Sequence, residues 1–356
     1  MIKKRNKVKK TKILAINFGG IGDEILFLPA LKTIRAFYPV PYLTLVVEPR
    51  SKSIKELSSL IDKIITCDVK GKFKYLNLIK LIFKAWSGRY DIVVSSGSSK
   101  LVAILLFLTG IRKRIGYDSG ILSKILLTKA VPLNKNQYAA DMYHDLATAI
   151  NTDQDSGLPE INILPENLVW ANEKIGIRDK QIITIHPGVS KLSIEKGIIK
   201  FWSITNWVEL IVKLLCSGKY KVILTGGPDD EGVFLQIRAE LARYNLPDDS
   251  LINLYGETKN ISQLAALISL SNMLVCVDSA PMHVGVGART PIVAIFGPTD
   301  EKKLLPQDDY RFTAVREDSI DCSPCLWDKR QTSCDYLDCL NIDSNKVFQA
   351  IEQQLS

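Results

Sequence analysis

The sequence predicts an α/β protein made of two Rossmann-like, doubly wound parallel-sheet domains. Short apolar runs rich in β-branched residues alternate with segments of helical periodicity in both halves of the chain. Such alternation is typical of parallel sheets covered by helices on both faces. A polar stretch over residues 152–159 interrupts the alternation once and has the composition of a linker. At 356 residues, the chain is also longer than one ordinary core supports.

The first domain is predicted over residues 13–160. In its first helix, Ile25, Leu26, Leu31 and Ile34 recur at helical spacing. The apolar runs predict strands over residues 12–17, 43–47, 61–67, 91–95 and 114–117. The periodic segments predict helices over residues 23–37, 76–86, from 101 onward and 139–151.

The second domain is predicted over residues 166–343, and a last helix follows it within residues 344–356. Its apolar runs predict strands over residues 182–186, 221–225, 251–254, 273–277 and 292–296. The segments between them predict helices over residues 205–216, 230–244, 261–268 and 281–286. Ligands of such sheets bind at the carboxyl ends of the strands, so candidate site residues are sought there.

The positive charge of the chain is concentrated in a basic tail, residues 1–12. The net charge is +8, and the first twelve residues hold six Lys, one Arg and no acid, which leaves +1 for the rest. A nearly neutral body argues against a nucleic-acid groove. The tail is either a solvated segment or an electrostatic contact to an anionic membrane, worth about 1 kcal/mol per basic residue near the surface.

No secretory signal or membrane span is expected. The apolar stretch after the tail breaks at Gly19-Gly20 without a cleavage-site pattern, and the longest uncharged apolar run, residues 101–111, is bounded by Lys100 and Arg112. Spanning a bilayer takes about 20 residues. We therefore expect a cytoplasmic protein that is peripheral to the membrane if the tail binds it.

The seven cysteines fall into two groups. Cys67, Cys216 and Cys276 lie in apolar contexts and are expected to be buried. The others form a CxxC followed by two more cysteines, a spacing that fits a structural zinc site, a closed loop or a thiol-rich surface loop. These are Cys322, Cys325, Cys334 and Cys339.

A glycine-rich turn joins the first strand to the first helix. Gly19, Gly20 and Gly22 allow close approach of a ligand, yet the turn matches neither the dinucleotide fingerprint nor a phosphate loop. Asp23 follows near the helix N-terminus, where the helix dipole favours a carboxylate. The carboxylate could accept a proton from a hydroxyl nucleophile, or it could simply cap the helix.

The segment Val277–His283 predicts a phosphate site. A buried strand leads directly into a helix, with Ser279 as the N-cap and Pro281 in the first turn. The free N–H groups and the dipole of such a helix N-terminus attract a phosphate. Asp278 and His283 lie beside it with groups that can hold sugar hydroxyls.

Further polar residues follow the other strands of the second domain. Lys200 could neutralise a diphosphate or be an ordinary surface lysine, and Glu257 could bind ribose hydroxyls or face water. The predicted donor-binding residues are His186, Gly188, Thr225, Gly226, Glu257, Ile261, Asp278, Ser279, Ala280 and His283. The one DxD sequence, Asp153-Gln154-Asp155, lies in the linker, so no catalytic metal and no cofactor is expected.

Together these residues resemble the family 9 glycosyltransferases, which include ADP-heptose:lipopolysaccharide heptosyltransferases. The most specific segments are IGDEILFLPAL (21–31), KFWSITNW (200–207), VDSAPMH (277–283) and FGPTD (296–300). The resemblance implies the GT-B arrangement, two Rossmann-like domains facing a cleft, with the last helix packed on the first domain. It also implies metal-independent transfer with inversion. Two departures are Ser203 in place of a proline and a longer stretch between His186 and Lys200.

The resemblance further implies roles for individual residues. Asp23 matches the catalytic base, Lys200 the lysine at the donor's phosphates, and Asp278, Ser279 and His283 the donor-binding set. The expected donor is an ADP-linked heptose or related sugar, and the expected acceptor is a lipopolysaccharide-core glycolipid or another glycan. Two alternatives remain, a GT-B-type sugar-nucleotide epimerase and a non-catalytic sugar-nucleotide-binding protein. The acid at position 23 favours an enzyme.

Overall fold

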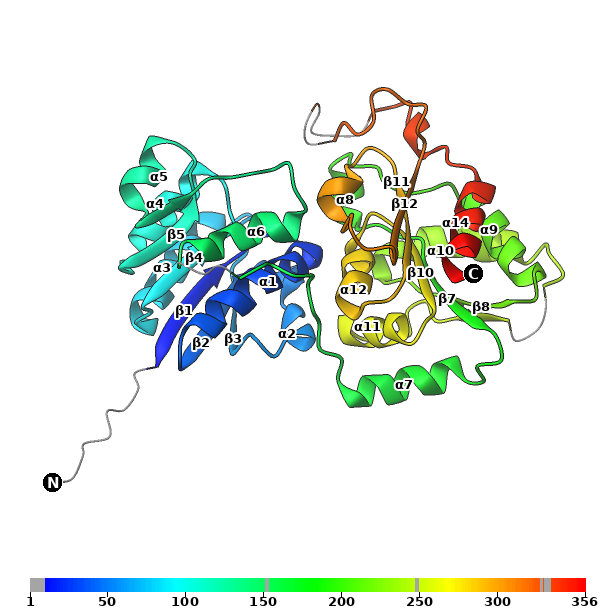
Figure 1. Cartoon of the computed structure of the whole chain (residues 1–356), viewed down its shortest axis with the longest axis horizontal. Helices are drawn as coiled ribbons and strands as arrows, with labels where there is room; N and C mark the ends of the chain where they lie inside the picture. The colour runs from blue at the N-terminus through cyan, green and yellow to red at the C-terminus, as the bar shows by residue number, and fades with distance from the viewer. Residues whose placement is uncertain (1–9, 151–153, 247–249, 327–328, 330–333) are drawn as a thin grey trace. The chain divides into compact units, whose positions relative to one another are not determined.

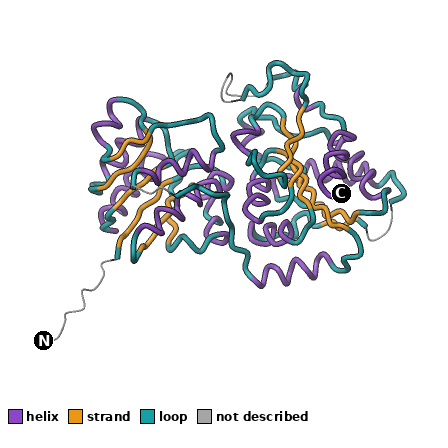
Figure 2. Tube along the Cα trace, viewed as in Figure 1, coloured by secondary structure: helices purple, strands orange, loops and turns teal. Residues whose placement is uncertain are grey.

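The chain forms two compact units, residues 1–160 and 161–356, each built on a six-stranded parallel sheet. The structure is a computed structural model that describes residues 10–150, 154–246, 250–326, 329 and 334–356. Most of the basic tail, Asp153 of the DxD sequence and part of the linker lie outside these residues. Figure 2 shows helices on both sides of the strands in each unit.

The first unit has its six strands in the order β3-β2-β1-β4-β5-β6. Their bounds are β1 Thr11–Ile16, β2 Pro41–Val47, β3 Lys63–Thr66, β4 Ile92–Ser95, β5 Lys113–Tyr117 and β6 Lys129–Val131. Ile13 of β1 pairs with Leu43 of β2 on one side and Ile92 of β4 on the other. The strand order therefore reverses between β1 and β4, and ligands of open parallel sheets bind at such a point.

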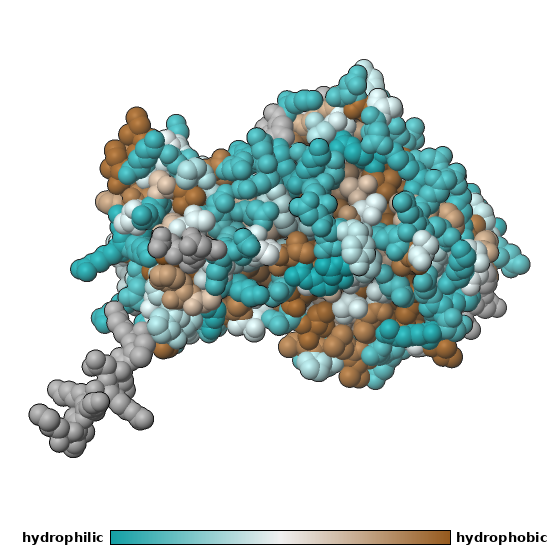
Figure 3. Space-filling model, in the orientation of Figure 1, coloured by the Kyte–Doolittle hydropathy of each residue, from teal (hydrophilic) through white to brown (hydrophobic). Residues whose placement is uncertain are grey.

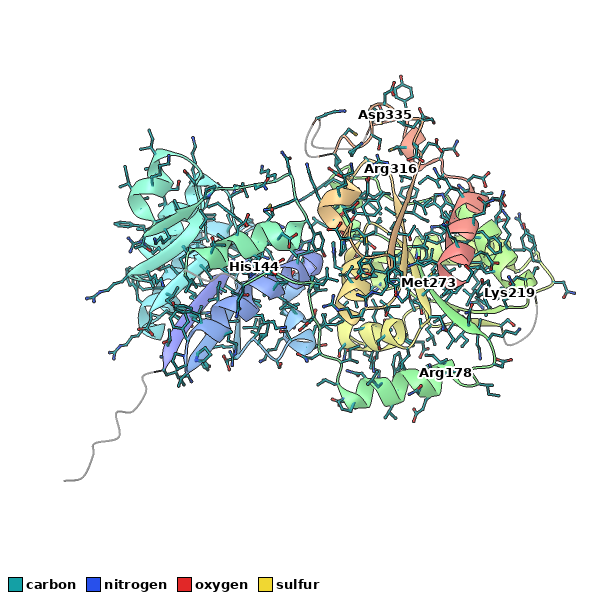
Figure 4. All side chains as sticks on the ribbon, in the orientation of Figure 1. His144, Arg178, Lys219, Met273, Arg316 and Asp335 are labelled. Carbon is teal, nitrogen blue, oxygen red and sulfur yellow. The ribbon has the colours of Figure 1, made fainter. Side chains whose placement is uncertain are left out.

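Helices cover both faces of the first sheet (Figure 1). Their bounds are α1 Ile21–Phe37, α2 Ile54–Leu57, α3 Lys74–Gly88, α4 Lys100–Leu108, α5 Ile121–Leu126 and α6 Ala139–Thr148. Helix α1 packs against α6 on one face, while α3, α4 and α5 lie side by side on the other. Leu81 and Ala85 of α3 and Leu106 of α4 pack on the sheet with Leu14 and Val93. His144 of α6, labelled in Figure 4, lies 2.9 Å through its Nε2 from the Thr33 hydroxyl of α1.

The second unit also has a six-stranded parallel sheet, and its strands lie in the order β12-β11-β10-β7-β8-β9. Their bounds are β7 Gln181–His186, β8 Tyr220–Leu224, β9 Leu251–Asn253, β10 Met273–Val277, β11 Ile292–Phe296 and β12 Phe312–Arg316. Cys276 of β10 pairs with His186 of β7. The strand order reverses between these two strands, so His186 and the start of the VDSAPMH segment lie at the same point of the sheet edge.

The helices of the second unit also form two layers (Figure 1). Their bounds are α7 Pro165–Ile175, α8 Lys191–Glu195, α9 Ile204–Cys216, α10 Glu231–Leu241, α11 Ile261–Ser269, α12 Ala280–Ala288, α13 Glu301–Leu304 and α14 Ser344–Leu355. Helices α9, α10 and α14 cover one face, and α7, α11 and α12 cover the other. Within the described ranges, no helix is long and apolar enough to cross a bilayer.

The last helix, α14, packs on the second unit. Helix α14 contacts α9, β11 and β12. Val347 and Ile351 on its apolar face are fully buried in the core of the second unit. Phe348, Ala350 and Leu355 of the same helix pack against this core and are partly buried.

The predicted strands are all present, with ends shifted by one or two residues. Strands β6 and β12 were missed, as were the helices α2, α5, α7, α8 and α13. Most of these elements have three to six residues, which is too short for periodicity to distinguish them from loops.

Candidate active site

In the first unit, Asp23 lies at the carboxyl end of β1, in the first turn of α1. Its Oδ2 accepts a hydrogen bond from the backbone N–H of Gly20 at 2.7 Å, so the carboxylate does cap the helix. Asn17 supports the same turn, because its Nδ2 donates to the Asp23 carbonyl at 3.2 Å and its Oδ1 accepts from Gly19 N–H at 3.0 Å. A Cβ at Gly19 would lie 2.3 Å from the Asp23 Cβ, so this position requires glycine.

Tyr143 of α6 holds the other oxygen of the Asp23 carboxylate. Its hydroxyl donates to Asp23 Oδ1 at 3.2 Å. Burial, followed by the nearby Asp23 charge, raises the pKa of the Tyr143 phenol well above its usual value, so the hydroxyl remains a donor. Asp23 itself is only half-buried, which leaves it open to a substrate. Sequence analysis missed Tyr143, since nothing in the local pattern of α6 connects it to a residue 120 positions away.

Glu24, the neighbour of Asp23, is a fully buried acid. Neither of its carboxyl oxygens has a hydrogen-bond partner among the described residues. Burial, and secondarily the charge of Asp23, raises the pKa of Glu24 well above its usual value. The carboxyl group is therefore neutral in the folded protein over a range of pH where it would ionise in the unfolded chain.

We predict that Glu24→Gln stabilises the protein, increasingly so as pH rises. Above the ordinary pKa of about 4.3, the unfolded chain releases a proton that the folded chain keeps, so folding loses stability with rising pH. Glutamine cannot ionise and removes this loss. Urea unfolding at pH 5 and pH 8 should show a larger gain for the variant at pH 8. An equal or smaller gain at pH 8 would mean that Glu24 is ionised in the fold.

In the second unit, Lys200 and Asp278 form a buried ion pair at the end of β10. Lys200 Nζ lies 2.9 Å from Asp278 Oδ2, and the two side chains are 12% and 5% exposed. Burial alone would raise the pKa of Asp278, but Lys200, with help from His283 and Thr299, holds that pKa below its usual value. Lys200 is thus no ordinary surface lysine. Its ammonium keeps the buried Asp278 carboxylate ionised in the site.

Helix α12 begins immediately after this pair. Ala280 is its first residue, Pro281 lies in the first turn as predicted, and His283 is buried one turn further. Ser279 occupies the N-cap position, yet its hydroxyl donates to the Val277 carbonyl at 3.3 Å instead of capping the helix. Ser279 is thus the N-cap residue, as predicted, but its side chain makes no cap hydrogen bond. The first-turn N–H groups of the helix thus do not use that side chain as an acceptor.

A buried histidine–aspartate pair lies beneath the loops that follow β7 and β8. His186 Nε2 lies 3.5 Å from Asp230 Oδ2, and His186 Nδ1 lies 3.3 Å from the Thr225 hydroxyl. Asp230 also accepts a hydrogen bond from Gly227 N–H at 2.8 Å. Burial lowers the pKa of His186 and raises the pKa of Asp230, because charge is disfavoured on both. Sequence analysis missed Asp230, although an acid three residues after Gly227 in a strand-end turn was the available signal.

Gly188 and Gly226 let these two loops close over Asp230. A Cβ at Gly188 would lie 1.7 Å from Asp230 Oδ1, and one at Gly226 would lie 3.0 Å from the Tyr255 ring.

We predict that Gly188→Ala lowers stability and donor affinity, because the loop must move off Asp230. Gly232→Ala is the control, since a Cβ there meets no atom within 4 Å. Thermal unfolding with and without nucleotide should separate the two variants, and equal behaviour would contradict the packing described.

The remaining predicted donor residues differ in their surroundings. Thr225 is buried and its hydroxyl donates to the Ile185 carbonyl, so it supports the loop from within. Glu257 is exposed, and its Oε2 lies 2.9 Å from Lys174 Nζ of α7. Ile261 begins α11 and is half-buried. Glu257 thus already has a cationic partner, which a ribose hydroxyl would have to share.

Ser203 replaces the proline that the resemblance led us to expect, and it caps α9. Its hydroxyl accepts from Asn206 N–H at 3.1 Å. Next to it, Trp202 is fully buried and donates from Nε1 to the Ile342 carbonyl at 2.8 Å. Serine thus starts this helix as its N-cap, and the neighbouring Trp202 is fixed in the core of the second unit.

The cysteine-rich segment packs on the loop after β11. Cys325 N–H donates to the Pro298 carbonyl at 2.9 Å, and a Cβ at Gly297 would lie 3.6 Å from Cys339 Sγ. Cys325 and Cys339 are buried, Cys334 is half-buried and Cys322 is exposed. Burial and the neighbouring sulfurs raise the pKa of Cys339 to about 11. In the part of the chain that the structure describes, no group of three or more His, Cys, Asp or Glu could hold a metal ion.

Two minor predictions have clear outcomes. Gln154 and Asp155 of the DxD sequence are exposed, as expected of a linker, while Asp153 lies outside the described residues. Cys67 and Cys276 are buried as predicted, but Cys216 at the end of α9 is exposed.

Comparison with known proteins identifies the family. The model for glycosyltransferase family 9 (heptosyltransferase) matches residues 79–334. The chain is 26% identical over 299 residues to lipopolysaccharide heptosyltransferase 2 of Escherichia coli K12, covering 81% of this chain and 83% of that protein. It is 24% identical over 288 residues to lipopolysaccharide heptosyltransferase 3 of the same organism, covering 78% and 80%.

Solved structures share the fold along the whole chain. The E. coli ADP-heptose lipopolysaccharide heptosyltransferase II aligns with a TM-score of 0.74 at 22% identity, covering 97% of this chain and 98% of that one. A family 9 glycosyltransferase from Veillonella parvula aligns with a TM-score of 0.78 at 23% identity, covering 97% of each. The fold is thus the GT-B fold of two Rossmann-like units. With its family model matched over residues 79–334, the chain belongs to glycosyltransferase family 9, the heptosyltransferases.

Proposed function

We propose that this glycosyltransferase moves a heptose or a related sugar from an ADP-linked donor to a lipopolysaccharide-core glycolipid or similar glycan. Transfer inverts the anomeric configuration and needs no metal ion. The observation that carries the proposal is the buried Lys200–Asp278 pair beside the N-terminus of α12, at the point where the strand order of the second sheet reverses. The family relationship supplies the sugar class, since relatives are heptosyltransferases.

The second unit binds the donor. The first-turn N–H groups of α12 and the Lys200 ammonium provide positive charge for the diphosphate, which supports transfer without a metal ion. Asp278 remains ionised beside Lys200. Its carboxylate can accept hydrogen bonds from sugar or ribose hydroxyls, and it holds Lys200 in position until the diphosphate takes over that cation.

The first unit binds the acceptor and activates it. The acceptor oxygen forms a bond to the anomeric carbon from the face opposite the diphosphate, and the bond from that carbon to the phosphate oxygen breaks with its electron pair. ADP leaves, and the acceptor proton passes to Asp23. The Tyr143 and Gly20 donors hold the two carboxylate oxygens in place for this transfer.

A nucleotide-sugar panel tests the donor assignment. Thermal unfolding should be recorded with ADP-, GDP- and UDP-sugars, because a ligand of the native state stabilises by about 2.7 kcal/mol at 100 times its Kd. ADP-heptose is expected to raise the melting temperature most. Radiolabelled heptose should then appear in a heptose-accepting lipopolysaccharide core. Stabilisation by UDP- or GDP-sugars alone would overturn the ADP assignment.

An epimerase is the second candidate, because such enzymes share this fold. The UDP-GlcNAc 2-epimerase of Methanocaldococcus jannaschii aligns with a TM-score of 0.55 at 10% identity. An epimerase needs no acceptor, so incubation with the donor alone separates the two functions. We expect unchanged donor in that incubation, and rapid formation of an epimer would favour the epimerase.

The setting we propose is the cytoplasm, at the inner face of the membrane. Six of the eight residues 3–10 are basic. Such a segment is attracted to anionic lipid, and a glycolipid acceptor is anchored in the same bilayer. No nucleic-acid partner is proposed.

A further inference from the structure

The body of the chain is neutral only on average. Residues 70–129 contain twelve Lys and Arg and two Asp, a net charge of +10 in a chain whose total is +8. Sequence analysis took the +1 left after the basic tail as a sign of a neutral body. Within the first unit, this segment forms α3, α4, α5 and the strands between them. Ten of the twelve basic residues are exposed, and Lys113 and Arg114 of β5 are half-buried. Positive charge is therefore concentrated at the surface of this segment.

The same helices expose a set of large apolar side chains. On α3 these are Tyr75, Leu76, Ile79, Phe83 and Trp86. At about 100° per residue they fall within one arc of roughly 100° on the helix surface. Leu81 and Ala85, on the other side of α3, pack in the core. Helix α3 thus has two apolar faces, and the side chains of the outer one are about half exposed or more.

The apolar surface continues over α4 and α5. Trp86 Nε1 donates to the Leu108 carbonyl at 2.9 Å, which ties the end of α3 to the end of α4. Leu101 of α4 is 71% exposed, and Ile121 and Ile125 of α5 are 78% and 69% exposed. Figure 3 shows apolar residues gathered at the surface over α5, at the upper left, with hydrophilic residues around them.

This surface connects the basic N-terminal segment to the catalytic edge of the first sheet. At one end, Lys12 Nζ donates to the Gly88 carbonyl at the end of α3, at 3.0 Å. At the other end, exposed Phe73, Leu101 and Ile121 precede or begin the three helices, just after the carboxyl ends of β3, β4 and β5. Asp23 follows the carboxyl end of β1, and parallel strands share one edge. The apolar surface therefore extends toward the same edge of the first sheet as Asp23.

We propose that the outer surface of α3, α4 and α5 docks on a bilayer that carries anionic headgroups. The apolar side chains enter the headgroup region, as those of an interfacial amphipathic helix do, and the lysines around them contact lipid phosphates. Trp86 and Tyr75 suit the membrane interface because their rings are both apolar and polar. Lysine is depleted at protein–protein interfaces, so the twelve basic residues favour a membrane over a second protein chain.

Vesicle binding by the full-length protein tests the docking surface. Vesicles of phosphatidylethanolamine and phosphatidylglycerol at 3:1 are compared with pure phosphatidylcholine in a sedimentation assay. The triple variant Leu101→Ser/Ile121→Ser/Ile125→Ser is expected to lower partitioning to the anionic vesicles about tenfold or more, since each side chain loses apolar burial. The matched control is Val169→Ser/Ile177→Ser/Leu235→Ser in the second unit, whose residues are similarly exposed. It should bind like the wild type.

Three results would overturn the proposal. The first is equal binding of the triple variant and the wild type. The second is complete loss of binding on deletion of residues 2–9, since the tail alone would then account for it. The third is a wild-type dimer in analytical ultracentrifugation that the triple variant abolishes, since the surface would then bind a second copy.

Membrane docking by this surface does not depend on the proposed reaction. A role of the surface in presenting a glycolipid acceptor does rest on the proposed function. Transfer to a water-soluble, delipidated acceptor should be the same in the triple variant and the wild type, while transfer to the vesicle-embedded acceptor should fall with binding. Absence of transfer to either acceptor by the wild type would contradict the proposed function and leave the vesicle-binding result to stand by itself.

Discussion

Replacing Asp23 by Asn is expected to lower the turnover number by about 10²–10⁴-fold, the usual contribution of a general base. The amide cannot take the acceptor proton. Its carbonyl oxygen can still accept from Gly20 N–H, as Asp23 Oδ2 does at 2.7 Å, so the glycine turn should persist. Asp23→Ala should lower turnover similarly and also lose the cap, which costs about 1 kcal/mol of stability. Steady-state transfer assays and urea unfolding measure the two effects.

Asp118 provides a matched control for this substitution. It also follows a strand of the first sheet, and its Oδ1 accepts from Gly120 N–H at 3.0 Å. Asp118→Asn should therefore keep full turnover. If Asp23→Asn also kept full turnover, its carboxylate would be a helix cap and nothing more, and the base would have to be found elsewhere.

Removing the Lys200 ammonium should impair both catalysis and folding. In Lys200→Ala, the diphosphate loses a cation, so the donor KM rises, the turnover number falls, or both. Asp278, 5% exposed, loses the partner 2.9 Å away. Breaking a buried pair on one side costs about 3–5 kcal/mol. Unchanged donor KM and turnover would remove Lys200 from the site.

The stability loss has a definite pH dependence. The lowered pKa of Asp278 contributes stability above its unfolded value of about 3.9, and this contribution disappears as pH falls through the lower, folded pKa. In Lys200→Ala the pKa of Asp278 rises, so protonation relieves the uncompensated charge at acid pH. The variant should differ most from the wild type near pH 7. Lys200→Ala/Asp278→Asn should be more stable there than Lys200→Ala, and additive losses would show that the two residues are not coupled.

The fold could be predicted because its long elements follow simple patterns. Strands β10 and β11 are continuous apolar runs and β7 and β8 are mostly apolar, as expected of strands buried on both faces. The position of α14 could not be predicted in this way. Its apolar residues predict that it packs against other elements, but its contacts to α9, β11 and β12 depend on the tertiary structure.

The candidate site was predicted where chemistry and strand ends coincide, and missed where it depends on distant residues. The motif around Asp278 and the glycine turn before Asp23 are local signals. Tyr143 and Asp230 are not, because each reaches its partner through the fold. Ser279 takes the predicted N-cap position, but its hydroxyl donates to the Val277 carbonyl and accepts no helix N–H. The basic surface of α3, α4 and α5 was missed because the net charge was counted over the whole chain. That count combines residues that lie far apart in the fold.

A crystal structure of the protein with an ADP-sugar would test the central claim most directly. The account predicts diphosphate oxygens within hydrogen-bond distance of the first-turn N–H groups of α12 and of Lys200 Nζ, with the sugar close to Asp278. A nucleotide bound away from the carboxyl ends of β7 and β10, with no contact to Lys200, would contradict it.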